Sequence, residues 1–171
     1  MANTKFEQEF SVDLDSPNLD VVKAVEVGIE IEQRGEKYYF EGAEKVSDEE
    51  LKRFLMFLGK QEIEHFEILN RLKQSLQEKQ QWIETTDKLE KPEIFQKGKE
   101  PVIKEGSEDL EILMHALEVE KQTRDYYRKF AENIDDATGK HFFEKLADFE
   151  QGHADLIQAM IDIRGESHIE T

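Results

Sequence analysis

Two copies of a Glu-x-x-His pair are the residues of this chain whose types and spacing best suit metal chemistry. The first pair is Glu62 with His65, and the second is Glu150 with His153. Residues three positions apart lie on one face of a helix, so each pair would present a carboxylate and an imidazole on the same side. One pair alone would be a weak signal, because 40 of the 171 residues are acidic.

The first pair interrupts an apolar stripe whose steps alternate between four and three residues. Leucine occupies the other six positions of this stripe: Leu51, Leu55, Leu58, Leu69, Leu72 and Leu76. This spacing is that of a helix facing the core of a bundle. The second pair lies in a similar stripe, which also contains Phe143, Leu146, Ile157 and Met160. Both pairs are therefore predicted to be buried.

An internal repeat relates the two halves of the chain at a constant offset of 88 residues, without a gap. Each half is predicted to be one helical hairpin, and two hairpins would form the bundle. The offset superposes the residues of interest in pairs: Glu32 on Glu120, Tyr38 on Tyr126, Tyr39 on Tyr127, Glu62 on Glu150, and His65 on His153.

Four glutamates are predicted to meet in the core: Glu32, Glu62, Glu120 and Glu150. Such carboxylates must take up protons or gain cations, because an uncompensated buried charge is very costly. Two divalent ions would supply four positive charges, and His65 and His153 would each add a neutral nitrogen ligand. These six residues are the predicted metal ligands, and iron, manganese or a mixed pair would suit them.

Tyr39 and Tyr127 follow the first glutamate of each half by seven positions, on the same helix face. Two interpretations remain open for them: packing in the core, or hydrogen bonding to a ligand carboxylate. Tyr38 and Tyr126 are expected to serve packing. Three histidines lie off the stripes and are interpreted as surface residues: His115, His141 and His168.

The expected fold is an all-α, antiparallel four-helix bundle over residues 16–171, preceded by an N-terminal arm over residues 1–15. The arm would dock on a partner or on the bundle. Residues 77–106 form a longer segment than the connection within a helical hairpin, which needs only about 2–8 residues. They indicate a crossover that makes the helices on either side run parallel, with Trp82 as an anchor. Helix starts are expected at Ser16-Pro17, at Ser47 in a capping box with Glu50, at Ser107 and at Asp135, and the last helix is expected to end at Gly165.

Composition excludes several classes of function. A net charge of −17 would repel nucleic acid and anionic lipid, so neither is an expected partner. The chain has no cysteine, which rules out disulfides, thiolate nucleophiles and cysteine-ligated metals. The first 20 residues contain no signal-peptide pattern, and no apolar run is long enough to cross a membrane. We therefore expect a cytoplasmic protein.

The motifs Glu32-x5-Tyr38-Tyr39, Glu62-x2-His65, Glu120-x5-Tyr126-Tyr127 and Glu150-x2-His153 are similar to those of rubrerythrins, within the ferritin-like superfamily. The similarity covers residues 19–164. It implies a ferritin-like bundle with a long crossover between its second and third helices, and a di-iron site bridged by Glu62 and Glu150. It further implies that Glu32 and Glu120 are terminal ligands, and that His65 and His153 bind one iron each.

The chain departs from the rubrerythrin pattern in two respects. Without cysteine, it is not expected to carry the rubredoxin domain of rubrerythrins proper. In addition, Thr123 stands where those proteins have an extra glutamate three residues after the third-helix ligand. In that family the extra glutamate is tied to iron movement during peroxide reduction, so its replacement weakens the expectation of peroxidase activity.

The resemblance implies an oxidoreductase that oxidises a ferrous pair with peroxide or dioxygen, in defence against oxidative stress. No catalytic residue is expected beyond the metal ligands. A separate donor protein would return electrons to the two iron ions, and a homodimer is expected. Two alternatives remain open: a non-catalytic iron-binding, storage or ferroxidase protein, and a metal-free helical interaction module.

Overall fold

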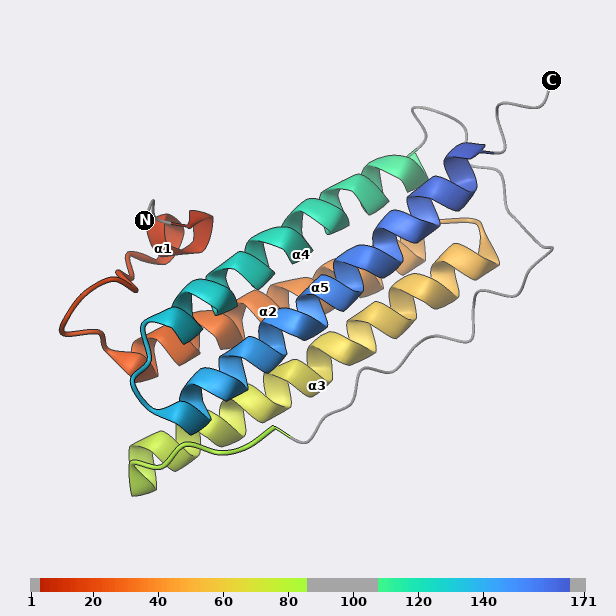
Figure 1. Ribbon diagram of the computed structural model, residues 1–171. Coiled ribbons are helices and arrows are strands. Elements are labelled where there is room, and N and C mark those ends of the chain that lie inside the picture. Colours follow the sequence, from red (N-terminus) through yellow and green to blue (C-terminus); the bar gives the residue numbers. More distant parts are fainter. Residues whose placement is uncertain (1–3, 86–107, 167–171) are drawn as a thin grey trace.

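The computed structural model describes residues 4–85 and 108–166, which form a bundle of long helices with a short N-terminal helix at its side (Figure 1). The described part of the chain contains no strand, which confirms the all-α prediction. Nor is any described helix long and apolar enough to cross a membrane. The helices are α1 (Lys5–Phe10), α2 (Val21–Lys45), α3 (Glu49–Lys79), α4 (Glu108–Glu132) and α5 (Ala137–Glu166).

The four long helices form two antiparallel hairpins. Helix α2 packs along α3, and α4 packs along α5. Figure 1 shows that α3 and α4 run in the same direction, whereas α2 and α5 run in the opposite one. The parallel orientation of α3 and α4 is therefore as predicted. Of the expected crossover, residues 86–106 lie outside the described residues, as does the predicted cap Ser107.

Trp82 anchors the start of the connection after α3, as expected. Its ring lies edge-on to Phe143, with ring centroids 6.4 Å apart. Gly139 near the start of α5 makes room for it, because a Cβ atom at that position would lie 2.5 Å from Trp82 Cδ2. The indole therefore ties this segment to the first turns of α5.

The predicted start of the first long helix at Ser16-Pro17 is wrong. Helix α2 begins at Val21, and the carboxylate of Asp20 accepts a hydrogen bond from the backbone N–H of Lys23 at 3.0 Å. The Ser16 hydroxyl instead accepts from the N–H of Asn18 in a turn. Serine and aspartate cap helices about equally well, so propensity alone did not distinguish the two sites.

The caps of α3 and α5 were each predicted one residue too early. The Asp48 carboxylate, not Ser47, accepts from the N–H of Leu51 at 2.7 Å. Asp136, not Asp135, accepts from the N–H groups of Thr138 and Gly139. Asp48 and Asp136 are themselves related by the offset of 88, so the repeat persists in the caps. Helix α5 also continues through Gly165 to Glu166, so that glycine does not end it.

The apolar core has two parts, one on each side of the buried polar residues. One part centres on Leu51, Leu55 and Leu58 of α3, packed with Tyr39, Leu113, Ile157 and Met160. The other contains Leu69 and Leu72 of α3, packed with Val25, Tyr127, Phe130, Phe143 and Leu146. The glutamates and histidines therefore lie between two layers of apolar side chains, which exclude water from both ends.

The N-terminal arm docks on the bundle through a buried ion pair. Lys129 of α4 donates to both carboxylate oxygens of Glu7, at 2.8 and 3.0 Å, and both side chains are buried. Glu7 also accepts from the backbone N–H groups of Thr4 and Leu14. Burial opposes ionisation of Glu7, but Lys129 and these N–H groups hold the pKa of its carboxyl below the ordinary value.

Candidate metal centre

The six predicted metal ligands converge in the middle of the bundle, and all of them are buried. Helices α2 and α4 supply one glutamate each, and α3 and α5 supply one Glu-x-x-His pair each. Ligand atoms of four of these residues, Glu62, His65, Glu150 and His153, lie within 4.8 Å of one another. The residues by helix are Glu32 on α2, Glu62 and His65 on α3, Glu120 on α4, and Glu150 and His153 on α5.

The cluster has two halves, each centred on one histidine. His65 Nδ1 lies 3.1 Å from Glu150 Oε1 and 3.5 Å from Glu32 Oε2. His153 Nδ1 lies 3.3 Å from the other oxygen of Glu150, Oε2, and 3.4 Å from Glu62 Oε1. It also lies 3.5 Å from Glu120 Oε2. Glu150 therefore spans both halves, with one carboxylate oxygen facing each histidine.

Most of these facing atoms have no hydrogen-bond partner. This holds for both histidine Nδ1 atoms, both oxygens of Glu150, Glu32 Oε2 and Glu62 Oε1. Their contacts of 3.1 to 3.5 Å do not have hydrogen-bond geometry. Buried polar atoms are rarely left in this state, because it costs about 1–3 kcal/mol for each group. Oxygen and nitrogen donors that converge on the same space fit divalent cations well.

The carboxyl groups of the cluster differ in their affinity for protons. Burial and, next, the neighbouring Glu150 raise the pKa of Glu120 to about 8, against an opposing effect of His153. Burial and the surrounding glutamates also raise the pKa of Glu62 well above its ordinary value. Burial opposes ionisation of Glu150 too, but His65 and His153 hold its pKa below the ordinary value.

The histidines show the complementary effect. Burial alone would lower the pKa of His65, but Glu150 and Glu32 outweigh it and raise the value to about 10. The glutamates around His153 raise its pKa in the same way. In the metal-free protein, protons therefore partly neutralise the cluster. Divalent cations would replace those protons, since metal ligands bind in their deprotonated forms.

Tyr39 and Tyr127 connect the two hairpins at the cluster. The Tyr39 hydroxyl donates to Glu120 Oε1, and the Tyr127 hydroxyl donates to Glu32 Oε1. Burial and the neighbouring carboxylates raise the pKa of both phenols well above the ordinary value, so they remain protonated donors. Of the two interpretations left open by the sequence, hydrogen bonding to a cluster glutamate is the one observed, although both rings are also packed in the core.

Tyr38 and Tyr126 do more than pack. The Tyr126 hydroxyl donates to the carbonyl of Ala24 on α2, and the Tyr38 hydroxyl donates to the carbonyl of Ile112 on α4, both at 2.9 Å. These two bonds obey the offset of 88 residues, as do those of the adjacent tyrosines. Four hydrogen bonds thus tie α2 to α4 across the bundle.

Two glycines on α2 allow close approach at the cluster. A Cβ atom at Gly28 would lie 3.2 Å from the Tyr127 ring, and one at Gly35 would lie 3.2 Å from Glu62 Cδ and Oε2. The repeat places Thr123 at the position equivalent to Gly35. Thr123 is buried, and its hydroxyl donates to the Val119 carbonyl at 3.1 Å, one turn back on the same helix.

The remaining polar candidates lie away from the cluster. His115 and His141 are exposed, as predicted, although the His115 ring also contacts Tyr38 with centroids 5.1 Å apart. His168 lies outside the described residues. A second acidic group, made of Glu7, Asp13 and Asp15, lies in the N-terminal arm. The Lys129 ammonium already binds Glu7 and Asp15 there, and the sequence alone did not reveal this pair.

The structure is thus an all-α bundle with a buried glutamate–histidine cluster that could hold metal ions. A sequence model of the family described as rubrerythrin matches residues 111–171, which include Glu120, Glu150 and His153. Over these residues the match agrees with the resemblance drawn from the motifs, and this part of the chain is similar to rubrerythrin. No curated protein and no solved structure matched the chain.

Proposed function

We propose that this protein binds two iron ions at the cluster and oxidises the ferrous pair with peroxide or dioxygen. The observation that carries the proposal is the position of Glu150, whose two oxygens face the Nδ1 atoms of two different histidines without hydrogen bonds. A single cation would leave one of these histidine–carboxylate contacts without a metal. Four carboxylates also balance the charge of two divalent ions.

The six residues would divide into shared and separate ligands. Glu150 is suited to bridge both ions, and Glu62, its counterpart in the repeat, is the proposed second bridge. Glu32 and Glu120 would bind one ion each, as would His65 and His153. When bound, two ferrous ions supply the two electrons that reduce peroxide to water, and a separate donor protein would return them.

The protein's own residues keep this site oriented and dry. Tyr39 holds its hydroxyl proton against Glu120 Oε1, and Tyr127 does the same at Glu32 Oε1, so each fixes the carboxylate of the other hairpin. Leucine and phenylalanine side chains above and below the cluster exclude bulk water. The attraction between carboxylate ligands and metal cations is stronger in such a low-dielectric site than in water.

Anaerobic loading with ferrous iron tests the proposal. We expect two iron ions per chain, and oxidation on stopped-flow mixing with peroxide or, separately, with dioxygen. Glu150→Gln should lose iron at both positions, whereas Glu67→Gln, at an exposed position on α3, should bind iron normally. Fast oxidation by peroxide would establish peroxidase activity despite Thr123. Binding without oxidation by either reagent would contradict the redox function.

The same samples separate the alternatives. We propose a homodimer, which light scattering would distinguish from the large shell expected of a storage protein. Failure to take up iron, in a protein that remains folded, would leave only a helical interaction module.

A further inference from the structure

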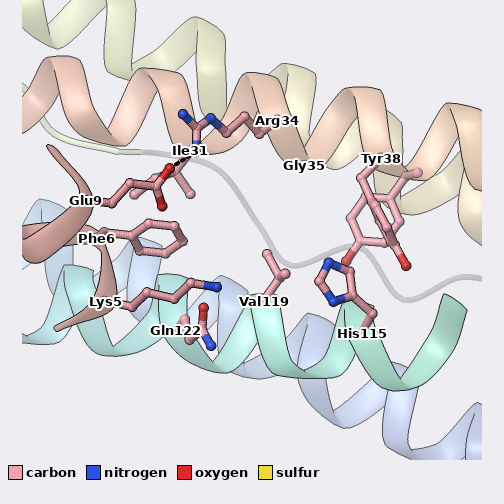
Figure 2. A pocket seen from close by; sticks show the side chains of 11 residues that line it. Lys5, Phe6, Glu9, Ile31, Arg34, Gly35, Tyr38, His115, Val119 and Gln122 are labelled. Atoms are coloured by element: carbon pink, nitrogen blue, oxygen red, sulfur yellow. Dashed lines mark hydrogen bonds and ion pairs between the residues drawn. The ribbon is translucent and has the colours of Figure 1, made fainter. Parts of the chain in front are cut away.

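A cavity of about 210 Å³ lies between the N-terminal arm and helices α2 and α4 (Figure 2). Its apolar wall includes Phe6 of the arm, Ile31 of α2 and Val119 of α4. For comparison, an engineered apolar cavity of about 150 Å³ binds benzene. The volume is therefore large enough for a small organic molecule with a single ring or a short chain.

The inner wall of this cavity adjoins the candidate metal centre. Gly35 and Tyr39 both line the cavity. On its other side, Gly35 lies against the carboxylate of Glu62, and the Tyr39 hydroxyl donates to Glu120. A molecule in the cavity would thus be separated from two carboxylates of the cluster by a single layer of residues.

The two hairpins contribute unequally to the cavity. Equivalent positions of the repeat line it in two cases, Ile31 with Val119, and Arg34 with Gln122. At the next equivalent pair, Gly35 lines the cavity but its counterpart Thr123 does not. The arm, which contributes Lys5, Phe6 and Glu9, precedes the first half and covers one end. The cavity therefore exists because the arm is docked.

The rim of the cavity carries two basic side chains, Lys5 and Arg34, although the net charge of the chain is −17. Arg34 is neutralised, since it forms ion pairs with Glu9 and with Glu30. Lys5, by contrast, makes no ion pair with any other residue that the structure describes. Figure 2 places Lys5 and Gln122 at one end of the cavity, with Tyr38 and His115 at the other and Val119 between them.

We propose that this cavity binds a small, mainly apolar organic acid. The carboxylate would lie at the Lys5 ammonium, and the hydrocarbon body would pack between Phe6 and Val119 and extend toward Gly35. Binding itself requires no metal.

Titration of the full-length, metal-free protein with three probes tests this inference. Benzoate, benzyl alcohol and benzylamine share an aromatic body but carry an anionic, a neutral and a cationic head group. Calorimetry or NMR should show saturable binding of one benzoate per chain. We expect benzoate to bind about three- to fivefold more tightly than benzyl alcohol, the gain typical of one partly exposed ion pair, and benzylamine to bind most weakly.

Three variants locate the site. Val119→Phe should fill the cavity and weaken benzoate binding at least about tenfold, since the ring would lose its packing volume. The matched control is Met114→Phe, at an exposed position on the same helix, and should bind normally. Lys5→Gln should remove the advantage of benzoate over benzyl alcohol without changing the affinity for the alcohol.

Absence of saturable binding by both benzoate and benzyl alcohol would overturn the inference. Equal binding by the Val119→Phe protein would do so as well, and if that variant does not fold, Gln122→Trp at the rim provides the same test. An unaltered preference for benzoate in Lys5→Gln would refute the role of the ammonium. These results are independent of iron loading, so either proposal can fail while the other stands.

Discussion

At the scale of single residues, the cluster combines groups with opposite preferences for charge. Burial keeps Glu62 and Glu120 protonated above their ordinary range, whereas two histidines keep Glu150 ionised. In the metal-free protein, protons on Glu62, Glu120 and the two histidines therefore offset the ionised Glu150. Small side chains and hydroxyl groups around the cluster then determine how closely its carboxylates can approach one another.

Gly35→Ala tests the close approach of α2 to Glu62. Replacing glycine within a helix by alanine should stabilise the metal-free protein by about 0.5–1 kcal/mol. The new Cβ would press on the Glu62 carboxylate, 3.2 Å away, so iron affinity should fall. Urea unfolding and anaerobic iron titration measure the two effects. Gly42→Ala on the same helix is the control, because its Cβ would meet Leu55 at an ordinary 3.4 Å.

Adjacent tyrosines provide a second test. Tyr127→Phe removes the hydrogen bond to Glu32 and should weaken metal binding by about 10–100-fold, as loss of an outer hydrogen-bond partner commonly does. Tyr126→Phe removes a bond to the Ala24 carbonyl and should cost about 0.5–1.5 kcal/mol of stability without affecting metal affinity. Equal metal affinities in the two variants would show that Tyr127 serves only packing.

At the scale of elements, specific contacts fasten the segments outside the four long helices to the bundle. Lys129 fastens the arm to α4, and Gly139 admits Trp82 to the first turns of α5. The anchor of the arm departs from the repeat, since the position in the first half that matches Lys129 is Glu41. These contacts are among the features in which the two halves of the bundle differ.

Gly139→Ala should release Trp82 from the bundle. The new Cβ would lie 2.5 Å from the indole, which is too close for the ring to remain in place. The chain has one tryptophan, so its fluorescence reports this site alone. We expect a red-shifted emission maximum and faster quenching by acrylamide. Lys140→Ala, at an exposed neighbouring position, should leave the spectrum unchanged. An emission maximum in Gly139→Ala that is not shifted to the red would disprove the contact.

At the scale of the whole molecule, the cluster makes the stability of the metal-free protein depend on pH. A group whose pKa is raised by folding stabilises the protein fully below its unfolded pKa and loses that effect as the pH rises through its folded value. The pKa of Glu120 is raised from 4.5 to about 8, and that of His65 from 6.5 to about 10. Stability of the metal-free protein should therefore decline across this range.

Thermal unfolding between pH 6 and pH 9 measures this dependence. The Tm of the metal-free protein should fall as the pH rises, because the buried cluster loses the protons that neutralise it. With bound Mn²⁺, which avoids oxidation during the experiment, the decline should disappear, since metal affinity increases as ligands deprotonate. A metal-free Tm that is constant or rises over this range would contradict the electrostatic description of the cluster.

Much of the architecture was predictable because the sequence repeats its pattern. The apolar stripe of α3 and the offset of 88 residues predicted two hairpins, and six buried polar residues were correctly placed at their centre. Glutamate and histidine at positions where leucine should pack are a signal that depends only on helical periodicity. Periodicity requires no knowledge of the partner helix, which is why these predictions succeeded.

Tertiary structure alone decided the features that depend on distances between helices. Asp20, Asp48 and Asp136 became the caps because packing of the bundle selected among neighbouring candidates of similar propensity. Only the packed structure showed that Glu150 faces both histidines, and that Gly35 adjoins both Glu62 and a cavity beneath the arm. The sequence determined which residues face the core, since that follows from helical periodicity. Their partners follow from how four helices and an arm pack together, which no local pattern contains.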